Sequence, residues 1–206
     1  MSEVNALLVR ELRDKTNAGM LDCKKALVET GGDLDKAVVY LREKGLAVAA
    51  KKAARAASEG MVSSYIHAGG KIGVLVEVNC ETDFVARTPE FQALVKDVAM
   101  QVAATNPQYV RREEVPASAV EAEKQIFRAQ AKESGKPDNV IERMIEGKVS
   151  KFYTDICLLE QPFIKDPQRT VGQLVTDAIA RIGENIVVRR FARFQLGETT
   201  PTLEAN

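Results

Sequence analysis

The first 45 residues show the hydrophobic spacing of three short helices. Apolar side chains recur there every three or four positions, as they do on the buried face of an amphipathic helix. Asn17-Ala18-Gly19 separates the first helix from the second, and Gly31-Gly32 ends the second. Asp33 is placed to cap the third helix, which we expect to end at Gly45. The helices are predicted over about residues 5–15, 20–30 and 34–45.

A strand pattern follows. Between Ile72 and Asn79 the side chains alternate between two faces, which is the period of a β-strand. Residues 61–67 form its expected partner, and Ala68-Gly69-Gly70 between the two is typical of a hairpin turn. A last strand is predicted over residues 185–195. A sheet of three strands leaves two edges that invite pairing with another copy of the chain, so we predict a homodimer.

The chain leaves the middle strand through a short turn and then takes up helical spacing. Thr82 is a good helix N-cap, and Asp83 would then lie in the first turn, where negative charge is favoured. Phe84 and Val85 are adjacent, so one helix face cannot bury both. Two interpretations stay open: Phe84 is packed beneath the sheet, or it stands at the tip of the turn as a probe aimed at another molecule.

Longer helical patterns fill the rest of the chain. They are predicted over about residues 89–105, 116–134, 139–159 and 171–182, with Thr170 as the N-cap of the last. Gly135-Lys136-Pro137 joins the second and third of these into an expected antiparallel hairpin over about residues 116–160. Pro162 and Pro167 bracket a predicted loop.

These patterns predict an α+β protein. Residues 1–45 would form a three-helix bundle of the ubiquitin-associated type, and residues 46–58 a helical linker. Residues 59–197 would form a core domain, in which a small antiparallel three-stranded sheet packs with helices and carries the helical hairpin. Residues 198–206 read as a frayed tail.

Charge and composition narrow the function. The 29 basic residues balance the 29 acidic ones, which is unlike the basic footprint of a dedicated nucleic-acid binder. Lys51, Lys52 and Arg55 could still touch RNA or an acidic protein face, although three charges are few and a solvated linker is the favoured explanation. No apolar run is long enough to span a bilayer, and the charged N-terminal residues do not read as a signal peptide. We expect a cytoplasmic protein that binds neither membrane nor nucleic acid.

Candidate catalytic chemistry is sparse. Cys23, Cys80 and Cys157 are far apart and include no CxxC pair, so they read as buried reduced thiols. The single histidine, His67, has no local sign of a catalytic Cys-His pair. Each Gly-Lys pair lacks the Ser or Thr that completes a phosphate-binding loop. We therefore expect no catalytic residue, no cofactor and no metal site, which favours a binding or regulatory protein.

Four blocks of sequence carry a resemblance to a known family. They are residues 12–27, 77–85, 151–163 and 182–186. Through them, and from the N-terminus to about Gly197, the chain closely resembles elongation factor Ts, the family of exchange factors for elongation factor Tu. The longer members contain two related core halves. Because this sequence shows one Ile-Gly-Glu-Asn-Ile block, it resembles a short form, in which a second subunit can supply the missing half.

The resemblance implies a mechanism and two groups of site residues. Members of the family bind elongation factor Tu in its GDP-bound and nucleotide-free forms, displace Mg²⁺ and promote GDP release. The segment expected to press on the GTPase domain, with its aromatic as a wedge, is Thr82, Asp83, Phe84 and Val85. The segment expected to dock the helical bundle is Ala18, Gly19, Met20 and Leu21.

Three other functions stay open from the residues alone. The helical bundle is generic, so a ubiquitin-like-domain or other protein-binding adaptor without exchange activity is the main alternative. A nucleic-acid binder would use the basic residues of the linker, and its affinity would fall steeply with salt. A thiol enzyme would use Cys80, which lies next to the turn.

Overall fold

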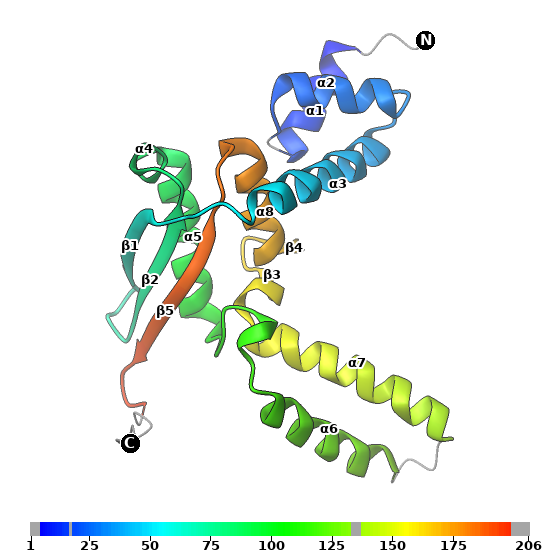
Figure 1. Ribbon diagram of the computed structural model, residues 1–206, viewed down its shortest axis with the longest axis vertical. Helices are drawn as coiled ribbons and strands as arrows, with labels where there is room; N and C mark the ends of the chain where they lie inside the picture. Colours follow the sequence, from blue (N-terminus) through cyan, green and yellow to red (C-terminus); the bar gives the residue numbers. More distant parts are fainter. Residues whose placement is uncertain (1–4, 17, 133–136, 199–206) are drawn as a thin grey trace. The chain divides into compact units, whose positions relative to one another are not determined.

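Three helices at the N-terminus pack around a small apolar core. The computed structural model describes residues 5–16, 18–132 and 137–198. Helix α1 spans Ala6–Thr16, α2 spans Met20–Glu29 and α3 spans Leu34–Lys52 (Figure 1). Their shared core consists of Val9, Leu12, Cys23, Ala26, Leu27 and Ala37. The predicted helical bundle is thus confirmed, with the spacing of apolar residues as its cause.

Helix α3 begins where the sequence predicts but ends later than predicted. Asp33 caps α3, because its carboxylate accepts a hydrogen bond from the backbone N of Lys36 at 3.0 Å. The prediction that Gly45 ends this helix is wrong, since α3 continues to Lys52. A mid-helix glycine costs about 1 kcal/mol relative to alanine, but packing can outweigh that cost. Gly45 is buried, and a Cβ placed on it would lie 3.8 Å from the Cβ of Ala180.

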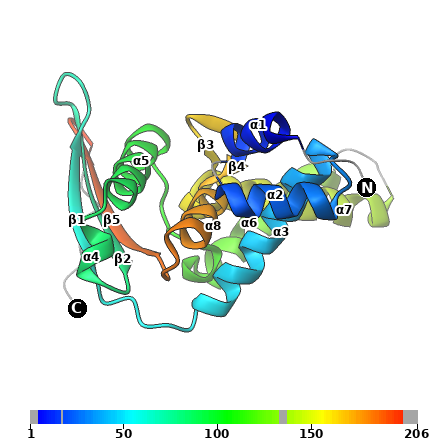
Figure 2. The same ribbon diagram turned by 90° about the horizontal axis from the view of Figure 1, so that it is seen from above.

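The central sheet has three strands in the order β1-β2-β5. They are β1 (Glu59–Ile66), β2 (Ile72–Cys80) and β5 (Val187–Gln195). The predicted hairpin turn is confirmed: Gly69 and Gly70 have φ of +89° and +70°, a region that favours glycine. Helix α5 (Pro89–Thr105) runs beside the sheet (Figures 1 and 2). The predicted α+β class, with a small antiparallel sheet, is therefore confirmed.

Two long helices form the predicted hairpin. They are α6 (Ala117–Lys132) and α7 (Asp138–Ile156). Ala131 of α6 packs with Ile141 and Ile145 of α7, with Phe127 and Val149 beside them. Residues 135 and 136 of the predicted turn lie outside the described residues. The short 3₁₀ helices η1 (Arg112–Glu114) and η2 (Leu158–Glu160) flank the pair in sequence.

A second, smaller sheet was not foreseen. Strands β3 (Pro162–Phe163) and β4 (Asp166–Thr170) pair antiparallel where the two prolines predicted a loop. Strand β3 is too short to show an alternating pattern, and β4, with the sequence Asp-Pro-Gln-Arg-Thr, has no alternation of apolar and polar residues. Helix α8 (Val171–Ile182) follows, and its predicted cap is confirmed. The Thr170 hydroxyl accepts from the backbone N of Gln173 at 3.1 Å, and the Gln173 side chain accepts from the Thr170 N at 2.9 Å.

The described chain divides into two units. The first contains Met1–Gly60, Asn79–Phe91 and Val175–Val187, and the second contains the remaining segments. The domain boundaries at residues 45 and 58 stay predictions, and residues 199–206 of the predicted tail lie outside the described residues. Within the described residues, no helix is both long and apolar enough to cross a membrane.

Candidate functional site

Phe84 stands on a single helical turn at the end of β2. This turn is α4, Asp83–Ala86, and Thr82 is its N-cap. The Thr82 hydroxyl accepts a hydrogen bond from the backbone N of Val85 at 3.4 Å. The Phe84 side chain is 79% exposed, so the interpretation that packs it beneath the sheet is wrong. Aromatic residues are enriched at protein–protein interfaces, so the exposed Phe84 is a candidate contact residue.

The neighbours of Phe84 differ from it in exposure. Asp83 and Val85 are half-buried. Asp83 forms an ion pair with Arg87 at 2.8 Å, one helical turn further on. Because the Arg87 side chain is largely exposed and that of Asp83 is about half exposed, the pair adds little to stability. The turn therefore needs another source of order.

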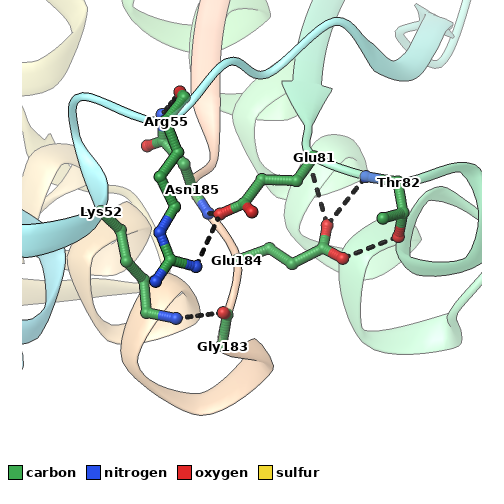
Figure 3. Close-up of polar contacts among 7 residues, drawn as sticks. All are labelled: Lys52, Arg55, Glu81, Thr82, Gly183, Glu184 and Asn185. Atoms are coloured by element: carbon green, nitrogen blue, oxygen red, sulfur yellow. Dashed lines mark hydrogen bonds and ion pairs between the residues drawn. The ribbon is translucent and has the colours of Figure 1, made fainter.

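Glu184 supplies that order from the segment that follows α8. Its Oε2 accepts hydrogen bonds from the backbone N of Glu81 at 3.0 Å and of Thr82 at 3.1 Å. Its Oε1 accepts from the Thr82 hydroxyl at 2.7 Å. Figure 3 shows the carboxylate of Glu184 directed at both donor residues. Hydrogen bonds to a carboxylate are roughly twice as strong as neutral ones, so this contact fixes the entry to α4.

A second carboxylate makes the reverse contact. Glu81 accepts a hydrogen bond from the backbone N of Asn185 at 2.6 Å and lies 3.5 Å from the guanidinium of Arg55. The Asn185 side chain is 4% exposed and donates to the backbone O of Arg55 at 2.8 Å. The adjacent residues 81 and 82 are thus hydrogen-bonded to the adjacent residues 184 and 185.

Gly183 makes this geometry possible. Its φ is +87°, and its backbone N donates to the O of Ile179 at 3.0 Å, which ends α8 in the left-handed conformation that favours glycine. Its carbonyl accepts a hydrogen bond from the ammonium of Lys52, the last residue of α3 (Figure 3). The segment 183–185 is therefore anchored to the end of α3 as well as to the turn.

Cys80 lies directly before the turn and is a poor candidate for reactive chemistry. Its thiol is fully buried and donates to the backbone O of Thr82 at 3.1 Å. Burial raises the pKa of the Cys80 thiol, and the negative charge of Glu184 raises this pKa further. A raised pKa leaves little of the nucleophilic thiolate at neutral pH. The geometry therefore gives no support to a thiol enzyme.

The second predicted segment lies at the corner between α1 and α2. Ala18 is half-buried against the bundle core, and its carbonyl accepts from the thiol of Cys23 at 3.7 Å. Gly19 is the extended residue before α2 and is exposed. The side chains of Met20 and Leu21 are 48% and 75% exposed. The corner thus presents two apolar side chains to solvent from the first turn of a helix.

Sequence reasoning found the exposed residues but not what holds them. Glu81, Glu184 and Asn185 appeared only as members of two blocks of the family resemblance. The one signal available was that both blocks carry a glutamate beside a polar residue. In the part of the chain that the structure describes, no cluster of three potential metal ligands occurs.

Comparison with known proteins gives the family. The profile described as Elongation factor TS matches residues 8–198. Elongation factor Ts of Geobacter sulfurreducens is 67% identical over 195 residues, which cover 95% of this chain and 90% of that protein. The factor of Heliobacterium modesticaldum is 63% identical over 195 residues (95% and 91%), and that of Desulforamulus reducens 61% over 198 (96% and 91%). The chain therefore belongs to the elongation factor Ts family and has the role of a translation elongation factor.

Proposed function

We propose that this chain is a guanine nucleotide exchange factor. It binds elongation factor Tu in its GDP-bound form, displaces Mg²⁺, stabilises the nucleotide-free form and so promotes GDP release in the cytoplasm. Phe84 is the wedge in this proposal, and the exposure of its side chain, at 79%, is the observation that carries it. The residues that press on the GTPase domain are Thr82, Asp83, Phe84 and Val85, and those that dock the bundle are Ala18, Gly19, Met20 and Leu21.

The thermodynamics of exchange require no covalent chemistry. GTPases hold their nucleotide through a phosphate-binding loop and a bridging Mg²⁺. A protein that binds the nucleotide-free GTPase more tightly than the loaded form must weaken nucleotide binding by the same factor. An exposed aromatic on a turn held by hydrogen bonds supports this proposal, because it can occupy space that the Mg²⁺ region needs. The chain's own part is thus binding energy rather than catalysis.

Release of a fluorescent GDP from elongation factor Tu tests the proposal. We expect the native chain to accelerate release, and Phe84→Ala to lose roughly 2–4 kcal/mol of coupling or binding, the scale of an interface hot spot. Ile126→Ala is the matched control, because Ile126 is also an exposed apolar residue (50%) but lies on α6. Full activity of a folded Phe84→Ala variant would move the mechanism away from the wedge.

The same assay separates the alternatives. An adaptor would bind a ubiquitin-like partner and leave GDP release unchanged. A nucleic-acid binder would retain RNA with an affinity that falls steeply as salt rises. A thiol enzyme would lose its activity in Cys80→Ala, whereas an exchange factor would keep it.

We also propose that the chain forms a homodimer through its three-stranded sheet. Strands β1 and β5 are the edges of this sheet. Leu75 of β2 is 48% exposed and Ile66 of β1 is 65% exposed. A Cβ on Gly73 would lie 3.2 Å from Ile66 Cδ1, so Ile66 covers Gly73 on the face that also carries Leu75. An apolar sheet face supports association with a second copy.

Mass in solution at micromolar concentration tests the dimer. We expect twice the chain mass of 22.6 kDa for the native chain and the monomer mass for Leu75→Asp. Ile126→Asp places the same charge on α6 and should leave the dimer intact. A native chain that is monomeric at this concentration would rule the dimer out.

A further inference from the structure

A short chain of hydrogen bonds links Glu184 to the α4 turn, which carries Phe84. The first link joins Glu184 to the backbone N of Glu81 and Thr82 and to the Thr82 hydroxyl. The second link is the hydrogen bond from the backbone N of Val85 to that same hydroxyl. Phe84 lies between the two bonded residues of the turn. Its backbone is therefore held on both sides although its side chain is largely exposed.

The support behind Glu184 is itself fixed. Gly183 is anchored to Lys52, and Asn185 is anchored to Arg55 and Glu81. Three polar contacts thus hold the residues on either side of Glu184 and fix the backbone from which its carboxylate reaches the turn (Figure 3). An exposed aromatic on a four-residue helix would otherwise sample many orientations, at a cost in entropy when it binds.

From this geometry we infer that Glu184 is a positioning residue for nucleotide exchange. It does not touch the partner in this scheme; it presets the α4 turn so that Phe84 enters the GTPase domain without further ordering. The inference rests on the proposed exchange function. Glu184, which follows α8, would thus contribute to exchange through the α4 turn, which lies about one hundred positions earlier in the chain.

The chemistry of the contact explains why a glutamate suits this position. A carboxylate accepts several hydrogen bonds and donates none, which matches three donors on the turn. Alanine would leave all three donors without this acceptor. Glutamine would keep one oxygen for the two backbone N–H groups, and its amide would donate to the Thr82 hydroxyl. Glutamine should therefore restore part of what alanine removes.

The test measures GDP release from elongation factor Tu against the concentration of each variant. For Glu184→Ala we expect a maximal release rate lower by about tenfold or more, the scale of losing hydrogen bonds to a charged group. We expect Glu184→Gln to recover part of that loss. The matched control is Glu90→Ala, because the Glu90 carboxylate lies in the same unit and accepts its hydrogen bond from Arg181, at 2.7 Å, rather than from the turn.

A double variant separates positioning from general stability. If Glu184 acts through Phe84, adding Glu184→Ala to Phe84→Ala should slow release by less than about twofold more. Hydrogen exchange in the free chain gives a second readout: the amides of Thr82 and Val85 should exchange faster in Glu184→Ala than in Glu90→Ala.

The outcomes divide clearly. Equal release rates for Glu184→Ala and Glu90→Ala, with the native chain active, would overturn this inference and leave the proposed function intact. A loss as large in the Phe84→Ala background as in the native one would also overturn it, because Glu184 would then act elsewhere. A native chain that does not accelerate release would overturn the proposed function and, with it, this inference.

Discussion

The corner between α1 and α2 and the α4 turn both expose apolar side chains, but they are held in different ways. Behind Met20 and Leu21 lies an apolar core that includes Leu12, Cys23 and Leu27. Behind Phe84 lies a set of hydrogen bonds that ends on Glu184. Burial in an apolar core stabilises a segment but is non-directional, whereas hydrogen bonds constrain the orientation of the groups that they join. Binding and stability should therefore change together at the corner and separately at the turn.

The largest effect is expected from the core behind the corner. Leu12 is fully buried, so Leu12→Ala should lower the free energy of unfolding by about 2–5 kcal/mol, through lost burial and a cavity. Urea denaturation measures this change. Leu7→Ala is the matched control, because Leu7 lies on the same helix and is 71% exposed. Equal stability of the two variants would mean that the corner does not depend on this core.

A smaller effect is expected from the polar support of the turn. Asn185 is 4% exposed, and Asn185→Ala should cost about 1–3 kcal/mol because the carbonyl of Arg55 loses its donor. Asn79 makes the same kind of bond, to the carbonyl of Glu59 at 3.2 Å, but in a more exposed place. Thermal unfolding of Asn79→Ala should therefore stay closer to that of the native chain. The reverse order would show that burial does not strengthen this contact.

The sequence predicted what local chemistry decides. Asp33, Thr82 and Thr170 are caps as expected, because each cap depends on a backbone N–H only three residues away. The sequence-based prediction was wrong at Gly45, where α3 continues although glycine has a low helix propensity. Gly45 is buried close to Ala180, and this packing outweighs the low propensity. Neighbouring residues cannot reveal such a tertiary contact.

The candidate site divides in the same way. The helical spacing after β2 predicted the turn and left the exposure of Phe84 open. The partner of Thr82, however, is Glu184, which lies 102 positions further along the chain. No period or motif links two residues at that separation. The structure was therefore needed to find what orders the turn.

The Thr82 hydroxyl offers a milder change at the turn itself. Thr82→Val keeps the shape of the side chain but removes its bonds to Glu184 and Val85, and should cost about 1 kcal/mol, as the loss of an N-cap does. Thr82→Ser retains the hydroxyl and should stay near the native stability. GDP release should slow in the valine variant more than its small loss of stability explains. If the valine and serine variants release GDP equally fast, the hydroxyl does not orient the turn.

The smallest effect concerns pH and belongs to the bundle. The pKa of Asp33 is lowered, first by the hydrogen bond from the backbone N of Lys36 and then by the Lys36 side chain. A carboxyl whose folded pKa lies below its unfolded value, near 3.9, contributes stability above that value and loses it as pH falls through the folded pKa. Asparagine is an equally good N-cap but carries no charge, so Asp33→Asn should differ from the native chain only through this charge.

Melting temperatures measured at pH 7 and near pH 3 test this prediction. The native chain should melt slightly above Asp33→Asn at pH 7, and this difference should shrink at the lower pH. Because the Asp33 side chain is well exposed, solvent screens the charge and keeps the difference small. An advantage that grows toward low pH would contradict the assigned direction, since the charged form of Asp33 would then destabilise the cap.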